Sequence, residues 1–139
     1  MGGIRMKKYI SIFICVVFML GLCACGGKVI GVNIKSVESD VYSQSEINSA
    51  INVIKKEFIL NWKGCTLKQI YYAGDDELEE YQDWADWHDA DEVIVLVSSF
   101  DVDSSGGDGS LEPNTNYANW KWILVRSNGG TWKHVDHGY

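Results

Sequence analysis

Basic residues are scarce in this chain of 139 residues, which has 12 Lys and Arg against 19 Asp and Glu. Three of the bases, Arg5, Lys7 and Lys8, stand together near the start, which leaves nine bases against 19 acids and a net charge of −10 for the rest. Such a charge disfavours a polyanionic partner, and we expect no binding to nucleic acid. It suits a soluble extracytoplasmic domain whose acidic surface could attract cations.

An apolar run long enough to span a bilayer is also missing. The longest, residues 9–22 (YISIFICVVFMLGL), has 14 residues, whereas a membrane-spanning helix needs about 20. Because it follows the three early bases, the run is typical of a secretory signal peptide. The alternative is an uncleaved N-terminal anchor.

The residues behind this run, 22–27 (LCACGG), resemble the lipobox of bacterial lipoproteins. The resemblance implies that residues 1–24 are a signal peptide, removed before Cys25, and that Cys25 carries a lipid such as palmitate. Cys23 departs from the motif at a tolerant position. It could itself be the modified residue, but the residues before it match the motif less well. The expected location is the extracytoplasmic face of the cell membrane, with the lipid on Cys25 as the anchor.

Cysteine is scarce in the part of the chain that remains after the expected cleavage. Cys15 and Cys23 leave with the signal peptide and Cys25 carries lipid, so Cys65 is the only thiol left and no intramolecular disulfide can form. The core must then hold the fold alone. We expect Cys65 to be buried as a small apolar residue, although a lone thiol in an exported protein could be reactive or pair between chains.

A long helix opens the domain proper, residues 42–139. We interpret residues 25–41 as the lipidated cysteine and a tether, with an extended stretch at 29–34. Ser43 and Glu46 form a capping box, in which each side chain accepts from the other's backbone N–H. Apolar residues then recur at three- and four-residue spacing as far as Trp62, which predicts one apolar stripe.

Strand-forming residues fill four further segments: Thr66–Tyr72, Glu92–Val102, 119–127 and 131–136. Between the first two, Glu77–His88 predicts a short acidic helix capped by Asp75 or Asp76. The second segment is apolar on both faces, as in a central strand covered on both sides. Asn128-Gly129-Gly130 predicts a tight turn between the last two segments.

This order predicts an α+β fold in which the long helix lies on a curved antiparallel sheet. The opening helix, Ser45–Trp62, and the closing hairpin 120–138 (WKWILVRSNGGTWKHVDHG) resemble the nuclear transport factor 2-like (cystatin-like) superfamily. The chain is particularly similar to small bacterial lipoprotein domains of unknown function with a Gly-Cys-Thr-Leu strand and a Gly-Gly-Asp-Gly-Ser loop. The resemblance spans Tyr42–Tyr139 and implies a cystatin-like roll. Members range from isomerases and dehydratases to pure binding modules, so the activity stays open.

The loop after the second strand contains a candidate calcium site. Residues 101–112 match the spacing of a calcium loop, with acids at positions 1, 3 and 12, an oxygen at 5 and glycine at 6. The candidate ligands are Asp101, Asp103, Ser105 and Glu112. The flanks are strands rather than helices and Pro113 follows directly, so the alternative is a solvated hairpin loop with glycines at positive φ. We expect no other cofactor.

The last strand offers a candidate catalytic pair. In a regular strand His134 and Asp136 share a face, where they could form an acid–base pair or bind a metal, with His88 as a distant third group. The superfamily's enzymes use Asp, Tyr or His inside the cavity of the roll. The alternative is hydrogen-bonded histidines without a catalytic role.

Aromatic residues are numerous for so short a domain. A cavity that they line could hold an apolar or sugar-like ligand, and the alternative is an ordinary core. The set comprises Trp62, Tyr71, Tyr72, Tyr81, Trp84, Trp87, Tyr117, Trp120, Trp122 and Trp132. Trp84 and Trp87 lie on the short acidic helix, where exposure would mark a partner surface.

These observations favour a lipid-anchored binding or scaffolding module at the cell envelope, without catalysis. Its partner would be an envelope protein or a small apolar ligand. One alternative is a small cavity enzyme, isomerase- or dehydratase-like, that uses His134 and Asp136. Another is a calcium-binding module that uses residues 101–112.

Overall fold

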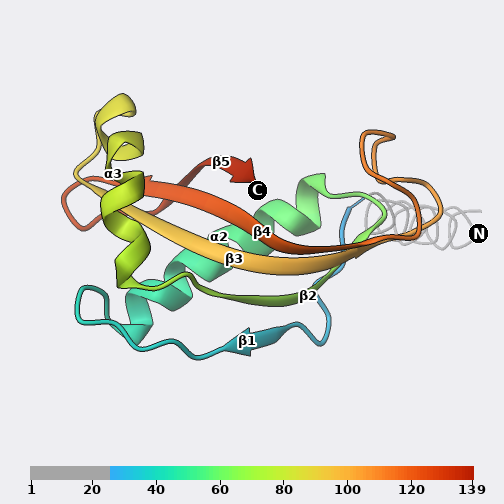
Figure 1. The fold of residues 1–139 in the computed structure, drawn as a ribbon, viewed down its shortest axis with the longest axis horizontal. Coiled ribbons are helices and arrows are strands. Elements are labelled where there is room, and N and C mark those ends of the chain that lie inside the picture. Colours follow the sequence, from blue (N-terminus) through green and yellow to red (C-terminus); the bar gives the residue numbers. More distant parts are fainter. Residues whose placement is uncertain (1–25) are drawn as a thin grey trace, which may run out of the picture.

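The computed structural model describes residues 26–139. Helix α2 covers one face of a five-stranded sheet, and the short helix α3 covers part of the other (Figure 1). The strands are β1 (Asn33–Lys35), β2 (Cys65–Tyr72), β3 (Glu92–Val102), β4 (Asn116–Arg126) and β5 (Lys133–Gly138). The helices are α2 (Gln44–Asn61), the 3-10 turn η1 (Asp75–Glu77) and α3 (Leu78–Trp87). The predicted α+β class is confirmed.

The sheet is mixed rather than antiparallel throughout. Its strands lie in chain order, and β2, β3, β4 and β5 pair antiparallel as predicted. Strand β1 pairs with β2 in parallel, so the prediction of a fully antiparallel sheet is wrong at this edge. The register shifts within the β2–β3 and β3–β4 pairs, and such irregularities increase local twist and bending. Figure 1 shows the long strands curving past α2.

Helix α2 begins as its sequence predicts. The Ser43 side chain accepts from the Glu46 backbone N–H, and the Glu46 carboxylate accepts from the Ser43 N–H, so the capping box is complete. The predicted apolar stripe is buried against the sheet at Ile47, Ile51, Ile54 and Phe58, and Ala50 is buried beside them. Burial of such a side chain contributes about 1.5–3 kcal/mol, so this stripe is the main attachment of the helix.

Strand β3 is the central strand that its two apolar faces predict. Ile94 and Leu96 belong to the core cluster under α2, whereas Val93 packs with Ala85 of α3 on the other face. The turn that joins β4 to β5 has φ of 55° at Asn128 and 63° at Gly129, which is the left-handed conformation that an Asn-Gly pair adopts readily.

Residues 27–35 are hydrogen-bonded to the rest of the domain, so the interpretation of residues 25–41 as a tether is wrong for this part of the segment. The Gly27 N–H donates to the Phe58 carbonyl at 3.0 Å, and the Leu67 N–H donates to the Lys28 carbonyl at 2.8 Å. The extended stretch expected at 29–34 becomes β1 only from Asn33, because residues 29–32 form a turn.

Asp75 does not cap the acidic helix, contrary to expectation. Neither η1 nor α3 has a side-chain cap. The Asp75 carboxylate instead accepts from the hydroxyls of Ser39 and Tyr72, at 2.5 and 2.8 Å, and from the Asp40 N–H at 2.8 Å. These bonds, the Ser39 hydroxyl first, hold the pKa of Asp75 below its usual value. The residue therefore ties the segment before α2 to the end of β2.

Candidate functional site

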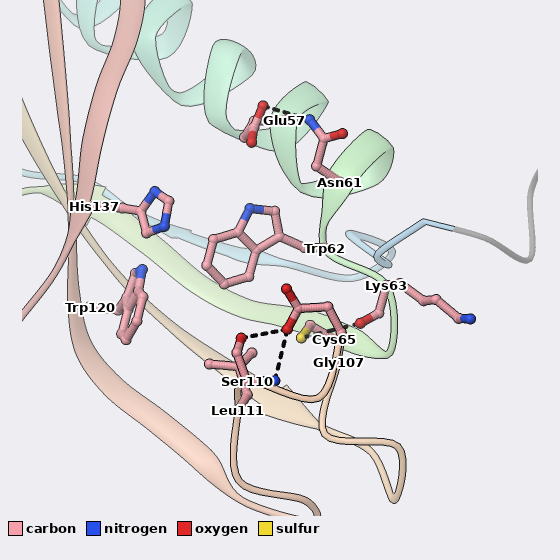
Figure 2. A pocket seen from close by; sticks show the side chains of 11 residues that line it. Glu57, Asn61, Trp62, Lys63, Cys65, Gly107, Ser110, Leu111, Trp120 and His137 are labelled. Carbon is pink, nitrogen blue, oxygen red and sulfur yellow. Dashed lines mark hydrogen bonds between the residues drawn. The ribbon is translucent and has the colours of Figure 1, made fainter.

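A pocket of about 270 Å³ lies where α2 ends and the β3–β4 loop begins (Figure 2). Its aromatic walls are Trp62 at the end of α2, Trp120 of β4 and His137 of β5. The other lining residues are Glu57, Asn61, Lys63, Cys65, Gly107, Asp108, Ser110 and Leu111. The end of α2, the β3–β4 loop, β4 and β5 thus converge on one small cavity with indole and imidazole walls.

The end of α2 positions Trp62. Its N–H donates to the Phe58 carbonyl at 3.1 Å as the C-cap of the helix, and the two rings stack with centroids 5.6 Å apart. Gly64 follows at φ +77°, which lets the chain leave the helix toward β2. The Trp62 indole then meets Trp120 and His137 edge-on, at 5.9 and 5.1 Å between centroids. This packing fixes the wall in one orientation.

Trp120 carries an unused hydrogen-bond donor beside the pocket. Its Nε1 is buried and has no partner within residues 26–139. The ring is held by Phe100 at 5.5 Å and Tyr139 at 5.1 Å, and Figure 2 shows the nitrogen on the side of the indole nearer His137. An unsatisfied buried donor costs about 1–3 kcal/mol. Because this atom is buried, a ligand acceptor would pair with it, and so recover that cost, only after the indole or a neighbouring ring turned.

The remaining polar groups of the pocket are mainly acceptors. Asn61 donates to the Glu57 carboxylate at 2.9 Å on the helix side. On the loop side, the backbone N–H and hydroxyl of Ser110 donate to Asp108, and these bonds, the hydroxyl first, lower the pKa of that carboxyl. Figure 2 shows the Lys63 ammonium pointing away. The pocket therefore suits a neutral or cationic ligand that brings hydrogen-bond donors.

Cys65 is buried, as expected for a small apolar residue, with 2% of its surface exposed. Burial, with the charge of Asp103 as a smaller cause, raises the pKa of its thiol to about 11. The thiol therefore stays protonated at neutral pH, where it is a poor nucleophile.

The structure does not bring His134 and Asp136 to one face, so that prediction is wrong. In the β4–β5 pair His134 lies opposite Leu124 and Asp136 lies opposite Ile123, which leaves Val135 as the extra residue of a β-bulge. His134 accordingly faces the α2 side, and Asp136 the α3 side. Neither residue lines the aromatic pocket, so the cavity-enzyme hypothesis loses its catalytic pair.

The bulge instead brings together His134 and His137. The Nε2 atom of His134 lies 3.2 Å from the Nδ1 atom of His137, and the His134 ring packs against Trp122 with centroids 5.3 Å apart. Burial lowers the pKa of His134, and the positive charge that His137 can carry lowers it further.

The calcium candidates are held by local hydrogen bonds. Asp101 accepts from the Asn116 side chain at 2.8 Å, and Asp103 accepts from the N–H and hydroxyl of Ser105, at 2.9 and 2.5 Å. Glu112 is exposed at the far end of the loop. Within residues 26–139 no three His, Cys, Asp or Glu side chains lie close enough to hold a metal ion. Calcium binding stays a prediction.

Trp84 and Trp87 differ in exposure. Trp87 is 67% exposed, as the partner-surface hypothesis requires, whereas Trp84 is half-buried against the cluster around Ala85. The expected lipidation site, Cys25, and the signal peptide lie outside the described residues. In the part of the chain that is described, no helix has the length and apolar character needed to cross a membrane.

No protein family model matches the chain, and neither a curated protein nor a solved structure is significantly similar to it.

Sequence reasoning named Trp62 and Trp120 only within a larger aromatic set, and it missed the pocket they share with His137. Glu57 and Asn61 were missed because they have the pattern of a solvated helix face. The one local signal of the pocket was the position of Trp62 directly before Lys63-Gly64, because the chain turns there at the end of the helix and directs the indole toward the core.

Proposed function

We propose that this chain is a lipid-anchored, extracytoplasmic binding module whose ligand site is the aromatic pocket. The observation that carries the proposal is the convergence of Trp62, Trp120 and His137 on one cavity, with an unpartnered indole N–H. Cavities with apolar walls and a few convergent polar groups are the usual form of small-molecule sites.

The pocket restricts the ligand to a compact molecule. Its volume of about 270 Å³ is just below the range of roughly 300–1,000 Å³ typical of such sites. Indole faces favour a flat apolar ring or the apolar face of a sugar. The acceptors Glu57 and Asp108 favour hydroxyl or ammonium groups on its edge. A small sugar or an aromatic amine has this combination.

The anchor would place the pocket close to the membrane. Gly27, two residues after Cys25, bonds to Phe58 on the last turns of α2, next to the pocket wall Trp62. Two extended residues span at most about 7 Å. A lipid on Cys25 would therefore hold this end of the domain near the bilayer surface, and ligands would arrive from the layer next to the membrane.

Membership of the nuclear transport factor 2-like superfamily is part of the proposal. It is supported by the long helix on a curved sheet and by the closing hairpin with its Asn-Gly turn. Strand β1, parallel at the edge, is an addition to the predicted roll. Binding modules occur in that superfamily, which is compatible with the pocket.

Two experiments test the two halves of the proposal separately. For the anchor, Cys25→Ser should abolish membrane retention of the mature form in cells that express the full chain. For the pocket, saturation-transfer NMR on the full chain in lipid nanodiscs would use glucose, N-acetylglucosamine and tyramine as probes. At least one probe should show transfer. Trp120→Phe removes only the indole N–H and part of the ring, and it should weaken the binding of that probe about tenfold.

A matched control is Trp132→Phe, because Trp132 also has a buried, unpartnered Nε1 but lies outside this pocket. It should bind the probe as the wild type does. Membrane retention of the mature form of Cys25→Ser would overturn the anchor, and absence of transfer from all three probes would overturn the proposed ligand class.

A further inference from the structure

Helix α3 has one face packed on the sheet and one face in solvent. Ala85 is fully buried against Val93, Ile123 and Val125 of the sheet. The exposed positions are Glu79, Glu80, Gln82, Asp83, Asp86 and Trp87. All of them except Trp87 are polar, so the indole is the one large apolar group on the solvent side of the helix.

Trp87 is held in place although it is exposed. Its ring meets Trp84 edge-on, with centroids 5.1 Å apart, and Trp84 is itself stacked on His88 at 6.3 Å. With 67% of its surface in solvent, Trp87 offers a large contact area at little further cost in side-chain entropy. Trp is among the residues enriched at the sites that dominate binding in protein interfaces.

The surroundings of Trp87 are strongly acidic. Residues 75–92, which include α3, contain ten of the 19 acids of the chain and no Lys or Arg. The bases paired with this segment are Lys121, at Glu77, and Arg126, at Glu92. Glu80, Asp83 and Trp87 stand at i, i+3 and i+7, so they share a stripe of the helix, and Asp86 precedes the indole. The indole thus lies within a field of negative charge.

The negative charge around Trp87 favours some binding partners of this helix face over others. A second copy of the chain would bring two acidic faces together, and anionic lipids or nucleic acids would be repelled. Figure 1 shows α3 at the end of the sheet away from residue 26, so on the proposed anchoring it faces away from the bilayer. A basic protein segment has the complementary charge.

Arginine matches this surface better than lysine. Its planar guanidinium can stack on the open indole while its N–H groups pair with a neighbouring carboxylate. The ammonium of lysine is strongly hydrated and offers no flat face. We propose that the face formed by Glu80, Asp83, Asp86 and Trp87 docks an arginine-rich segment of a partner protein. This goes beyond the proposed ligand site, because no residue of α3 lines the aromatic pocket.

The test compares two peptides of equal length and charge, one with arginine and one with lysine at its basic positions. The full chain is held in nanodiscs of uncharged phosphatidylcholine, so that the lipid does not attract the peptides, and binding is measured by calorimetry at about 150 mM salt. The arginine peptide should bind about fivefold more tightly. Trp87→Ala should remove that preference, and the variant should keep the wild-type melting temperature because the residue is exposed.

The acids are tested with a charge-matched pair of variants. Asp83→Asn/Asp86→Asn should lower the affinity for the arginine peptide about tenfold. Glu38→Gln/Asp40→Asn removes equal charge from another exposed segment and should leave this affinity within about twofold of the wild type. Equal binding of the two peptides, an unchanged preference in Trp87→Ala, or equal losses in both double variants would show general charge attraction and overturn the proposal. So would a dimer that Trp87→Ala dissolves.

Discussion

The Nε2 atom of His134 lies 3.2 Å from the Nδ1 atom of His137, although the two residues stand three positions apart on one strand. In a regular strand such residues point to opposite faces. The bulge at Val135 removes one step of the alternation, so both imidazoles lie on the α2 side. The contact is a hydrogen bond only when one of the two facing nitrogens carries a proton and the other does not.

We predict that the protein loses stability on mild acidification, and that His134 causes much of the loss. Burial, and then the charge of His137, holds its folded pKa below the ordinary value of about 6.5, although Glu57 and Asp136 act in the opposite direction. Between these two pKa values the unfolded chain binds more protons, so the free energy of unfolding rises with pH. The loss of stability caused by His134 is absent well above pH 6.5 and grows as the pH falls toward the folded pKa.

Urea denaturation of the purified protein at several pH values between about 5.5 and 7.5 measures this slope. His134→Gln should make the free energy of unfolding less dependent on pH. His88→Gln, at an exposed position after α3, removes the same type of group and should keep the wild-type slope. A His134→Gln protein with an unchanged slope would contradict the assignment.

The parts of the fold that the sequence predicts are those with local signals. Helix α2 has its capping box and stripe within one segment, and the Asn128-Gly129 turn needs only two residues. For β1 the sequence predicts an extended stretch at 29–34 but not its place in the sheet, because its three residues pair in parallel with a segment more than 30 residues away. No local signal marks the bulge at Val135 either, because a regular alternation of two residues was the only basis for assigning the side chains of β5 to one face or the other.

The candidate site could be predicted only in its composition. Aromatic residues were numerous, but whether a given indole lines a pocket or fills the core depends on tertiary packing. Trp122 is fully buried, whereas Trp120, two residues away on the same face, is partly open to the pocket. The difference arises because Trp120 packs against the edge of the core cluster, whereas Trp122 lies inside it.

A second prediction concerns Arg126, which joins α2 to two strands. Its Nε donates to Glu92 at 2.7 Å, its Nη2 pairs with Glu46, and its guanidinium carbon lies 4.3 Å from the centroid of a Trp132 ring. Arg126→Met should lower the free energy of unfolding by about 2 kcal/mol, because hydrogen bonds to charged groups contribute about 1.5–3 kcal/mol. The loss is limited because both carboxylates are 34% exposed and can be rehydrated.

Urea denaturation followed by tryptophan fluorescence measures the effect. Lys133→Met removes a base from an exposed position on β5 and should change the free energy of unfolding by no more than about 0.5 kcal/mol. If the two variants unfold at the same urea concentration, Arg126 does not join the helix to the sheet.

A third prediction concerns the attachment of residues 27–35. A Cβ on Gly27 would lie 2.4 Å from the Phe58 carbonyl oxygen and 2.7 Å from that of Trp62, so Gly27→Ala must displace the chain. We expect a loss of about 1–3 kcal/mol in the free energy of unfolding. Hydrogen exchange should also become faster at the Leu67 amide, which bonds to the Lys28 carbonyl.

Ser36→Ala, at an exposed position just after β1, is the matched control and should leave both measurements unchanged. Unaltered exchange at the Leu67 amide in Gly27→Ala would mean that the segment is attached by other contacts.

The last prediction follows from the calcium hypothesis. Ca²⁺ takes six to eight oxygen ligands, so Asp101 and Asp103 would have to share their present hydrogen bonds to Asn116 and Ser105 with the ion. After EDTA, Ca²⁺ at about 1 mM should then raise the melting temperature by several degrees, because an affinity of about 0.1 mM would stabilise the fold by about 1.4 kcal/mol. Glu112→Gln should abolish this shift and Glu38→Gln should not. Mg²⁺ should produce little shift, because it demands a smaller octahedral site. An unchanged melting temperature at millimolar Ca²⁺ would leave the loop as a solvated connection whose carboxylates serve only their serine and asparagine neighbours.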